Sequence, residues 1–201
     1  MADNYEKQVL IARELFLKYD QQKMIDKFHL RSDEEYLYIS FLDREYRISR
    51  KSGVIESENN VCMDYNIVMT IYDVLCCSKE MPLLSHQWVT QPCLQVTMSS
   101  PESDIFTRKY AEKFSGKTRE LLQACRKISG RVPKITAGSD VCYEFDMFPF
   151  FPVQFRYWDR DEEFPAQIKL LWDKNSLDFM HFETTYYAMN RLLRTLEENM
   201  E

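Results

Sequence analysis

Glycine and long apolar runs are both scarce in this chain, which has only 4 Gly among its 201 residues. No run approaches the roughly 18 consecutive apolar residues that a membrane-spanning helix needs. The first ten residues, MADNYEKQVL, contain no apolar core of the kind found in signal peptides. These absences predict a cytoplasmic protein with no membrane association.

A dense cluster of Lys and Arg is also missing, and the formal net charge is −6. A protein that binds nucleic acids in general needs a basic face, because it must neutralise phosphates. The sequence therefore predicts no general nucleic-acid role.

Cysteine is present, but the usual cysteine motifs are not, since none of the 6 Cys forms a C-x-x-C pair. No H-E-x-x-H stretch and no tetrad of Cys and His ligands indicates a closed zinc site. Without a secretory signal, we expect reduced thiols. The adjacent Cys76 and Cys77 end an apolar helical run. We interpret them as buried structural thiols in preference to a redox pair.

Motifs of common enzyme classes are absent as well, including G-x-S-x-G, G-x-G-x-x-G and a complete P-loop. The stretch FSGKT, residues 114–118, ends in G-K-T, but Ala111 stands where a P-loop needs its first glycine. We interpret FSGKT as a helix end followed by an N-cap at Thr118. The sequence identifies no catalytic residue and no cofactor.

What remains is an ordinary globular composition, 45% hydrophobic and 29% charged, with 13 Phe and 12 Tyr. This predicts a single domain over residues 1–201 with a substantial core. Apolar residues at helical spacing predict helices near residues 9–19, 24–28, 65–77, 105–114, 118–128 and from 184 onward. Strand formers predict two early strands, at 35–42 and 45–50, and three late ones, at 141–147, 153–158 and 167–172.

The three late strands alternate apolar and polar residues, as in an antiparallel meander with one buried face. On the polar face, Glu144 and Asp146 are predicted to form cross-strand ion pairs with Arg156 and Lys169. The whole pattern predicts an α+β fold, in which an antiparallel sheet of about five strands has helices packed on one face.

Four acids gather between two of the predicted late strands, and we call Asp159, Asp161, Glu162 and Glu163 the acidic turn. An EF-hand is excluded, because Phe164 occupies the sixth position of the loop, where the motif needs Gly. Two interpretations remain open. The acids form a looser cation or ligand site, or they form a solvated turn, which is commoner for exposed charge runs.

A second candidate lies before the last helix, where Asp178, His181 and Glu183 follow one another closely. A His with carboxylates can bind a transition metal or transfer a proton. Alternatively, Glu183 caps the helix and His181 is a packed residue with one hydrogen bond. The sequence favours the second interpretation and leaves the first open.

The last third of the chain contains FPFFPVQFRYWDRDEEFPAQIKLLWDKNSLDFMHFETTYYAMNRLL. Its prolines around a strand, its W-x-x-D-E-E-F-P-x turn, its W-D-x-N segment and its F-x-E-T helix start resemble domain-of-unknown-function family 3786. LYISFLDREYRISRKSGVI resembles the first hairpin of that family, and GSDVCYEF resembles a G-D-x-x-F strand start.

The resemblance implies no established activity. The family is found in anaerobic bacteria and archaea. Some members are joined to, or encoded near, iron–sulfur and corrinoid methyl-transfer proteins, so the resemblance suggests, by association, a role in anaerobic one-carbon metabolism. The chain departs from the family in SGRVPKITAGSD, where the glycines are separated instead of adjacent.

The function predicted first is therefore a non-enzymatic binding or accessory module of anaerobic metabolism with a protein partner. The alternative is a metal-dependent enzyme or metal-binding protein that uses acids of the late strands and His181. A third hypothesis is a homo-oligomer that associates through an aromatic surface such as FPFFP.

Overall fold

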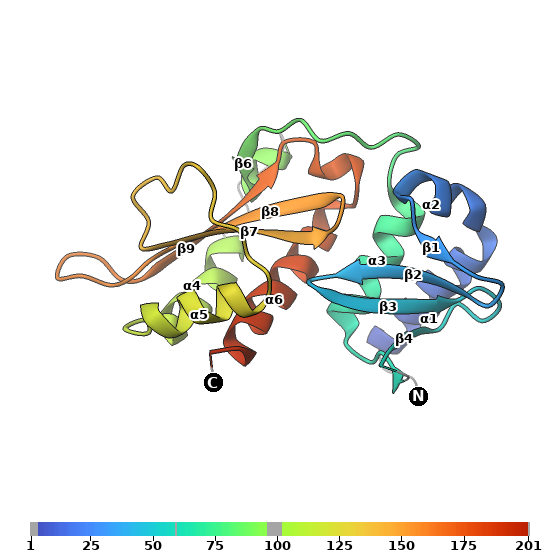
Figure 1. Cartoon of the computed structure of the whole chain (residues 1–201), viewed down its shortest axis with the longest axis horizontal. Coiled ribbons are helices and arrows are strands. Elements are labelled where there is room, and N and C mark those ends of the chain that lie inside the picture. The colour runs from blue at the N-terminus through green and yellow to red at the C-terminus, as the bar shows by residue number, and fades with distance from the viewer. Residues whose placement is uncertain (1–3, 59, 96–101, 201) are drawn as a thin grey trace.

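The computed structural model describes residues 4–58, 60–95 and 102–200 of the chain (Figure 1). Within these residues it contains six α-helices and two antiparallel sheets, which confirms the α+β class. No helix of the described ranges has the length and apolarity of a membrane span.

The N-terminal half packs helices against a sheet of five strands. The helices are α1 (Asn4–Lys18), α2 (Gln21–Phe28) and α3 (Tyr65–Cys77). The strands, in sheet order, are β1 (Arg31–Ser32), β2 (Tyr36–Phe41), β3 (Arg44–Ser49), β4 (Ile55–Ser57) and β5 (Asn60–Val61). The predicted early hairpin is the β2–β3 pair. It turns at Leu42 and Asp43, whose positive φ angles of 50° and 64° suit a tight two-residue turn.

Helix α3 is apolar on almost every side. Asp64 caps its first turn by accepting hydrogen bonds from the backbone N–H groups of Asn66 and Ile67. The predicted inward residues Ile67, Ile71 and Leu75 are buried. Residues on the other faces are buried too, because α3 contacts both α1 and the last helix, α6 (Phe182–Glu198).

The C-terminal half contains the second sheet, in the order β6 (Trp88–Thr90), β9 (Gln167–Asp173), β8 (Phe151–Trp158) and β7 (Val141–Phe148). Helices α4 (Glu102–Phe114), α5 (Thr118–Lys127) and α6 lie together on one face of it (Figure 1). The described segments also contain two 3-10 turns, η1 (Gln91–Leu94) and η2 (Ser176–Asp178). The predicted alternation is confirmed, since the apolar positions of the three long strands are buried.

The early hairpin and the late meander do not share the single five-stranded sheet that we predicted. The two sheets meet at a corner, where the backbone N–H of Leu42 donates to the carbonyl of Met147 at 3.0 Å. The short strands β1, β4 and β5 extend the hairpin, and β6 extends the meander. Each group of long strands thus completes its pairing with short neighbours from its own half.

The acids of the late strands do form ion pairs, but the cations that we predicted for them were wrong. The register places Arg156 opposite Cys142 and Lys169, not opposite the acids. Glu144 and Asp146 instead bind Arg131, which precedes β7 and also exchanges two backbone hydrogen bonds with Glu144. Arg156 donates to Gln154 of its own strand at 2.7 Å.

The aromatic segment FPFFP forms the tight β7–β8 connection. Phe148 and Phe151 are fully buried, and Phe150 stacks on Phe28 with ring centroids 4.1 Å apart. The segment therefore belongs to the core and offers little surface for self-association.

Candidate functional site

The acidic turn lies between β8 and β9, and its first acid is fully engaged within the fold. The Asp159 carboxylate accepts hydrogen bonds from the Tyr157 hydroxyl at 2.8 Å, the Thr118 hydroxyl at 2.9 Å and the Gly116 N–H at 2.9 Å. Thr118 thus holds Asp159, and Lys117 takes the N-cap position that we predicted for Thr118. Burial alone would raise the pKa of Asp159, but these hydrogen bonds outweigh it and lower the pKa to about 2.

The other acids of the turn are exposed. Asp161 accepts hydrogen bonds from the N–H groups of Glu163 and Phe164 at 2.8 and 2.7 Å, so it organises its own turn. Asp159 and Asp161 also line an open groove of about 1120 Å³ between α4 and the β8–β9 hairpin. A ligand role for the acidic turn, including Glu162 and Glu163, remains a prediction.

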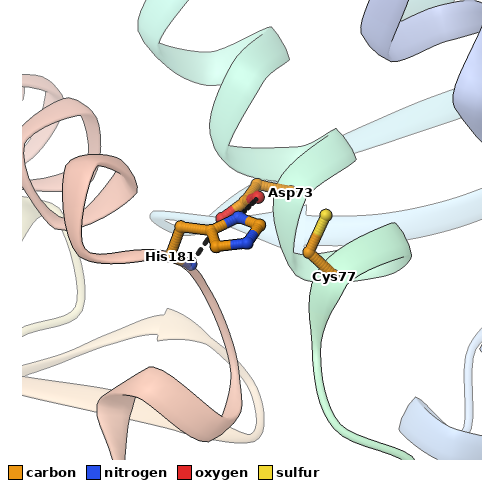
Figure 2. A group of neighbouring side chains, drawn as sticks. All are labelled: Asp73, Cys77 and His181. Carbon is orange, nitrogen blue, oxygen red and sulfur yellow. Dashed lines mark hydrogen bonds and ion pairs between the residues drawn. The ribbon is translucent and has the colours of Figure 1, made fainter.

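The structure places His181 apart from the acidic turn. The turn precedes β9, whereas His181 follows β9 and is the N-cap residue of α6. The two neighbours predicted for His181 do not bind it: Asp178 pairs with Lys79 at 2.7 Å, and Glu183 is exposed in the first turn of α6. The partner of His181 is Asp73 of α3, 108 residues earlier (Figure 2).

Asp73 binds the start of α6 with both carboxylate oxygens. Its Oδ2 accepts hydrogen bonds from the backbone N–H of His181 at 2.8 Å and from the Thr184 hydroxyl at 2.6 Å. Its Oδ1 lies 2.6 Å from Nδ1 of the His181 ring. The Asp73 side chain is 12% exposed and that of His181 is 64% exposed, so a fixed carboxylate orients an accessible ring.

Cys77 completes this group, which we call the Asp73 cluster (Asp73, Cys77 and His181). Asp73 and Cys77 are four residues apart on α3 and therefore lie on one face of the helix. One potential ligand atom from each of the three residues lies within 4.8 Å of the others. Figure 2 shows the three side chains together beside the C-terminal end of α3.

The thiol of Cys77 is not prepared for nucleophilic attack. Burial raises its pKa to about 12, and the neighbouring Asp73 carboxylate adds to this effect. A nucleophilic cysteine needs a lowered pKa, because the thiolate is the reactive form. Asp73, His181 and Cys77 are the residue types of a hydrolytic triad, but Cys77 is not held as the thiolate that such a triad needs.

The Asp73 cluster adjoins an apolar depression of about 250 Å³ between α1 and α3, which we call the α1–α3 groove. Ile11 and Leu15 of α1 face Met69 and Tyr72 of α3 across it. Asp73 and Cys77 also line this groove, so the polar cluster and the apolar surface are continuous.

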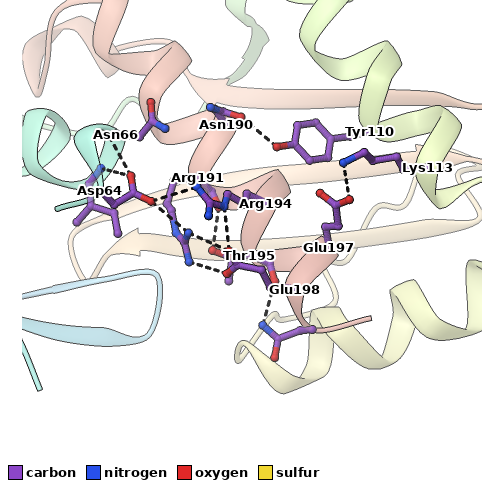
Figure 3. A network of polar contacts seen from close by, with 12 residues as sticks. Asp64, Asn66, Tyr110, Lys113, Asn190, Arg191, Arg194, Thr195, Glu197 and Glu198 are labelled. Atoms are coloured by element: carbon purple, nitrogen blue, oxygen red, sulfur yellow. Dashed lines mark hydrogen bonds and ion pairs between the residues drawn. The ribbon is translucent and has the colours of Figure 1, made fainter. Parts of the chain in front are cut away.

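A charged network fixes the two helices that carry the cluster (Figure 3). Asp64 caps α3 and also accepts from Arg191 of α6 at 3.4 Å. Arg191, whose side chain is only 12% exposed, binds Glu198 at 2.9 Å. This network joins the start of α3 to the middle of α6, so the relative position of Asp73 and His181 does not depend on their own contact alone.

Sequence reasoning found His181 but not Asp73 or the role of Cys77. One signal was available, because Asp73 is the only charged residue in the apolar helix YNIVMTIYDVLCC and lies one turn before Cys77. A carboxylate on a helix that is otherwise buried requires a polar partner.

Comparison with known proteins identifies the family of this chain. The model of the family described as a domain of unknown function, DUF3786, matches residues 20–195. No curated protein and no solved structure matches the chain. Asp73, Cys77 and His181 lie inside the matched range, and α1 precedes it. Because the match covers most of the chain, this protein belongs to the DUF3786 family.

Proposed function

We propose that this domain is a non-enzymatic binding or accessory module of the cytoplasm that recognises a protein partner through the α1–α3 groove. The observation that carries the proposal is the apolar side of this groove. Ile11 is 66% exposed and Leu15 is 37% exposed, one helical turn apart on the same flank of α1. Exposed apolar surface next to a concave site favours contact with another protein.

The size of the groove supports a protein partner over a cofactor. Sites for drug-sized ligands and cofactors enclose roughly 300–1,000 Å³. The α1–α3 groove, at about 250 Å³, is smaller and open to solvent. It suits one or two apolar side chains of a partner, as when a helix places its apolar residues in a groove.

The high pKa of Cys77 also favours binding over catalysis, because the only thiol beside a histidine in the described cluster stays protonated near neutral pH. The resemblance to the family supplies a candidate class of partner, namely iron–sulfur or corrinoid proteins of anaerobic metabolism. That class rests on the resemblance alone.

The test compares partner capture by the wild-type chain and by Ile11→Glu, from an oxygen-free lysate of the source organism. Ile135→Glu is the matched control, because Ile135 is 72% exposed and lies in the loop before β7, outside the groove. We expect the wild type and Ile135→Glu to retain the same partner and Ile11→Glu to lose it. Equal capture by all three would refute the proposal.

Light scattering on the same samples tests the homo-oligomer hypothesis. A dimer of the wild type that Ile11→Glu converts to a monomer would show that the groove binds a second copy of this chain. A wild-type monomer that captures a different protein would exclude that hypothesis.

A further inference from the structure

We propose that Asp73, Cys77 and His181 form a binding site for one divalent transition-metal ion of the zinc class, with a fourth position open to an external ligand. The proposal is independent of the partner-binding function and rests on the Asp73 cluster alone.

The chemistry of the three donors is selective. A carboxylate oxygen, a cysteine sulfur and an imidazole nitrogen together are the donor types of zinc sites. Hard cations such as Mg²⁺ and Ca²⁺ prefer oxygen ligands and gain nothing from sulfur. A set with three protein ligands is also the pattern of open sites, whereas closed structural sites use four.

The distances require only a small adjustment. Zinc bonds of roughly 2.0–2.3 Å at tetrahedral angles place ligand atoms roughly 3.3–3.7 Å apart. The three ligand atoms already lie within 4.8 Å of one another. The His181 side chain is 64% exposed, and Cys77 has one side-chain torsion to its sulfur, so rotations of these side chains can bring the three atoms to the required separations.

Asp73 serves as a direct ligand through Oδ1. That oxygen now lies 2.6 Å from Nδ1 of the His181 ring, so the exposed ring must turn and give up this contact when both groups bind the ion. Oδ2 meanwhile remains fixed by the Thr184 hydroxyl and by the His181 backbone N–H, so the carboxylate stays in place.

The local charge favours a cation. Asp73 and Cys77 lie in the last two turns of α3, where the helix dipole is negative. Lys27 already donates to the Ser78 carbonyl at 3.2 Å and to its hydroxyl at 3.0 Å, but it does not bind the Asp73 carboxylate. A bound dication would stabilise the Cys77 thiolate that burial otherwise opposes, so metal binding and thiol deprotonation are coupled.

The position of the cluster determines the side from which an external ligand would reach the open coordination position. Asp73 and Cys77 line the α1–α3 groove as well as the cluster. A group that enters the groove would therefore approach the ion past the apolar side chains of Ile11 and Met69.

The experiment uses the tag-free full chain, freed of metal by chelator and titrated with Co²⁺ while the absorption spectrum is recorded. We expect one Co²⁺ per chain, a sulfur-to-cobalt charge-transfer band in the near ultraviolet and the visible bands of a tetrahedral ion. Added Zn²⁺ should abolish these bands by competition. Absence of stoichiometric binding, or binding without the sulfur band, would overturn the proposal and leave His181 and Asp73 as a structural hydrogen-bonded pair only.

Variants identify the ligands. Cys77→Ser should remove the charge-transfer band, and Asp73→Asn and His181→Gln should each raise the zinc dissociation constant at least about 10-fold. Cys93→Ser and His86→Asn are the matched controls, because both residues are exposed and lie outside the cluster. Circular dichroism of the metal-free variants verifies folding, and Ser at position 77 is close in size to Cys. A band that persists in Cys77→Ser, or an equal loss in the controls, would contradict the assignment.

Ile11→Ser separates this inference from the proposed function. It removes apolar surface from the α1–α3 groove without adding a carboxylate beside Asp73 and Cys77. It should weaken partner capture and leave zinc affinity within about twofold of the wild type.

Discussion

The acidic turn and the Asp73 cluster both collect ionisable side chains, but they differ in how those side chains are satisfied. In the acidic turn, Asp159 accepts from backbone and side-chain donors of nearby segments, and its pKa is held near 2. In the Asp73 cluster, a thiol with a pKa of about 12 lies beside a carboxylate and an exposed imidazole. The turn is rich in charge and its first acid is occupied. In the cluster Asp73 is occupied as well, and the exposed ring of His181 is the accessible group.

This difference teaches that the density of acids along the chain is a poor guide to a binding site. A run of acids satisfies itself through short-range hydrogen bonds, as Asp161 does with the N–H groups two and three residues ahead. The groups of the Asp73 cluster come from α3 and from the start of α6, so their proximity exists only in the folded chain.

The largest effect on stability is expected at the acidic turn. Asp159→Ala leaves the Tyr157 hydroxyl, the Thr118 hydroxyl and the Gly116 N–H without their acceptor. We expect the free energy of unfolding to fall by about 2–4 kcal/mol, because hydrogen bonds to a charged acceptor are lost and the hydroxyl of the buried Tyr157 is left unpaired. Urea denaturation measures the change. Glu163→Ala, in the same turn but exposed, should change it by less than about 0.5 kcal/mol.

Acid should reproduce part of this loss in the wild type. The folded pKa of Asp159 lies below its unfolded value near 3.8, so its contribution is present above pH 4 and disappears as the pH falls toward 2. Denaturation at a series of pH values should show a shallower decline below pH 4 in Asp159→Ala. Parallel curves for the two proteins would show that Asp159 is not stabilised as described.

The thiol of the Asp73 cluster provides the next largest effect. With a pKa near 12 instead of roughly 8.5, Cys77 should react with an aromatic disulfide at pH 8 roughly 50-fold more slowly than a free cysteine peptide. The lower thiolate fraction outweighs the higher nucleophilicity of the thiolate. Mass spectrometry of each site gives the rate, and a Cys77 rate at or above that of the peptide would contradict the protonated thiol.

A smaller effect is expected when the carboxylate of the cluster is neutralised. Asp73→Asn weakens three contacts to the start of α6 and should cost about 1–2 kcal/mol in metal-free protein. His181→Gln keeps the backbone N–H that binds Asp73 and removes an exposed ring, so it should cost less than about 1 kcal/mol. If His181→Gln were the more costly of the two, the ring and not the carboxylate would anchor α6.

Local periodicity was enough to predict most elements of the fold. The apolar spacing in α3 and the alternation in β7, β8 and β9 both come from contacts within one element and its immediate neighbours. The division into two sheets was not predictable, because it depends on which short strands complete each group and on the corner between Leu42 and Met147.

The candidate site was predictable only in part for the same reason. His181 was identified by its chemistry, but its neighbours along the chain, Asp178 and Glu183, face Lys79 and solvent. Its true partner is 108 residues away and is brought to it by the packing of α3 against α6. A single sequence carries no direct signal for such a pair.

The position of α3 has a consequence for how the molecule unfolds. Because both α1 and α6 pack against this nearly all-apolar helix, loss of either half exposes apolar surface of α3 that the other half cannot cover. We therefore expect one cooperative transition. All three tryptophans, Trp88, Trp158 and Trp172, lie in the strands of the C-terminal sheet, so their fluorescence reports on that half alone. If the chain is the single domain that we predict, its midpoint should nevertheless coincide with that of the circular dichroism of the whole chain.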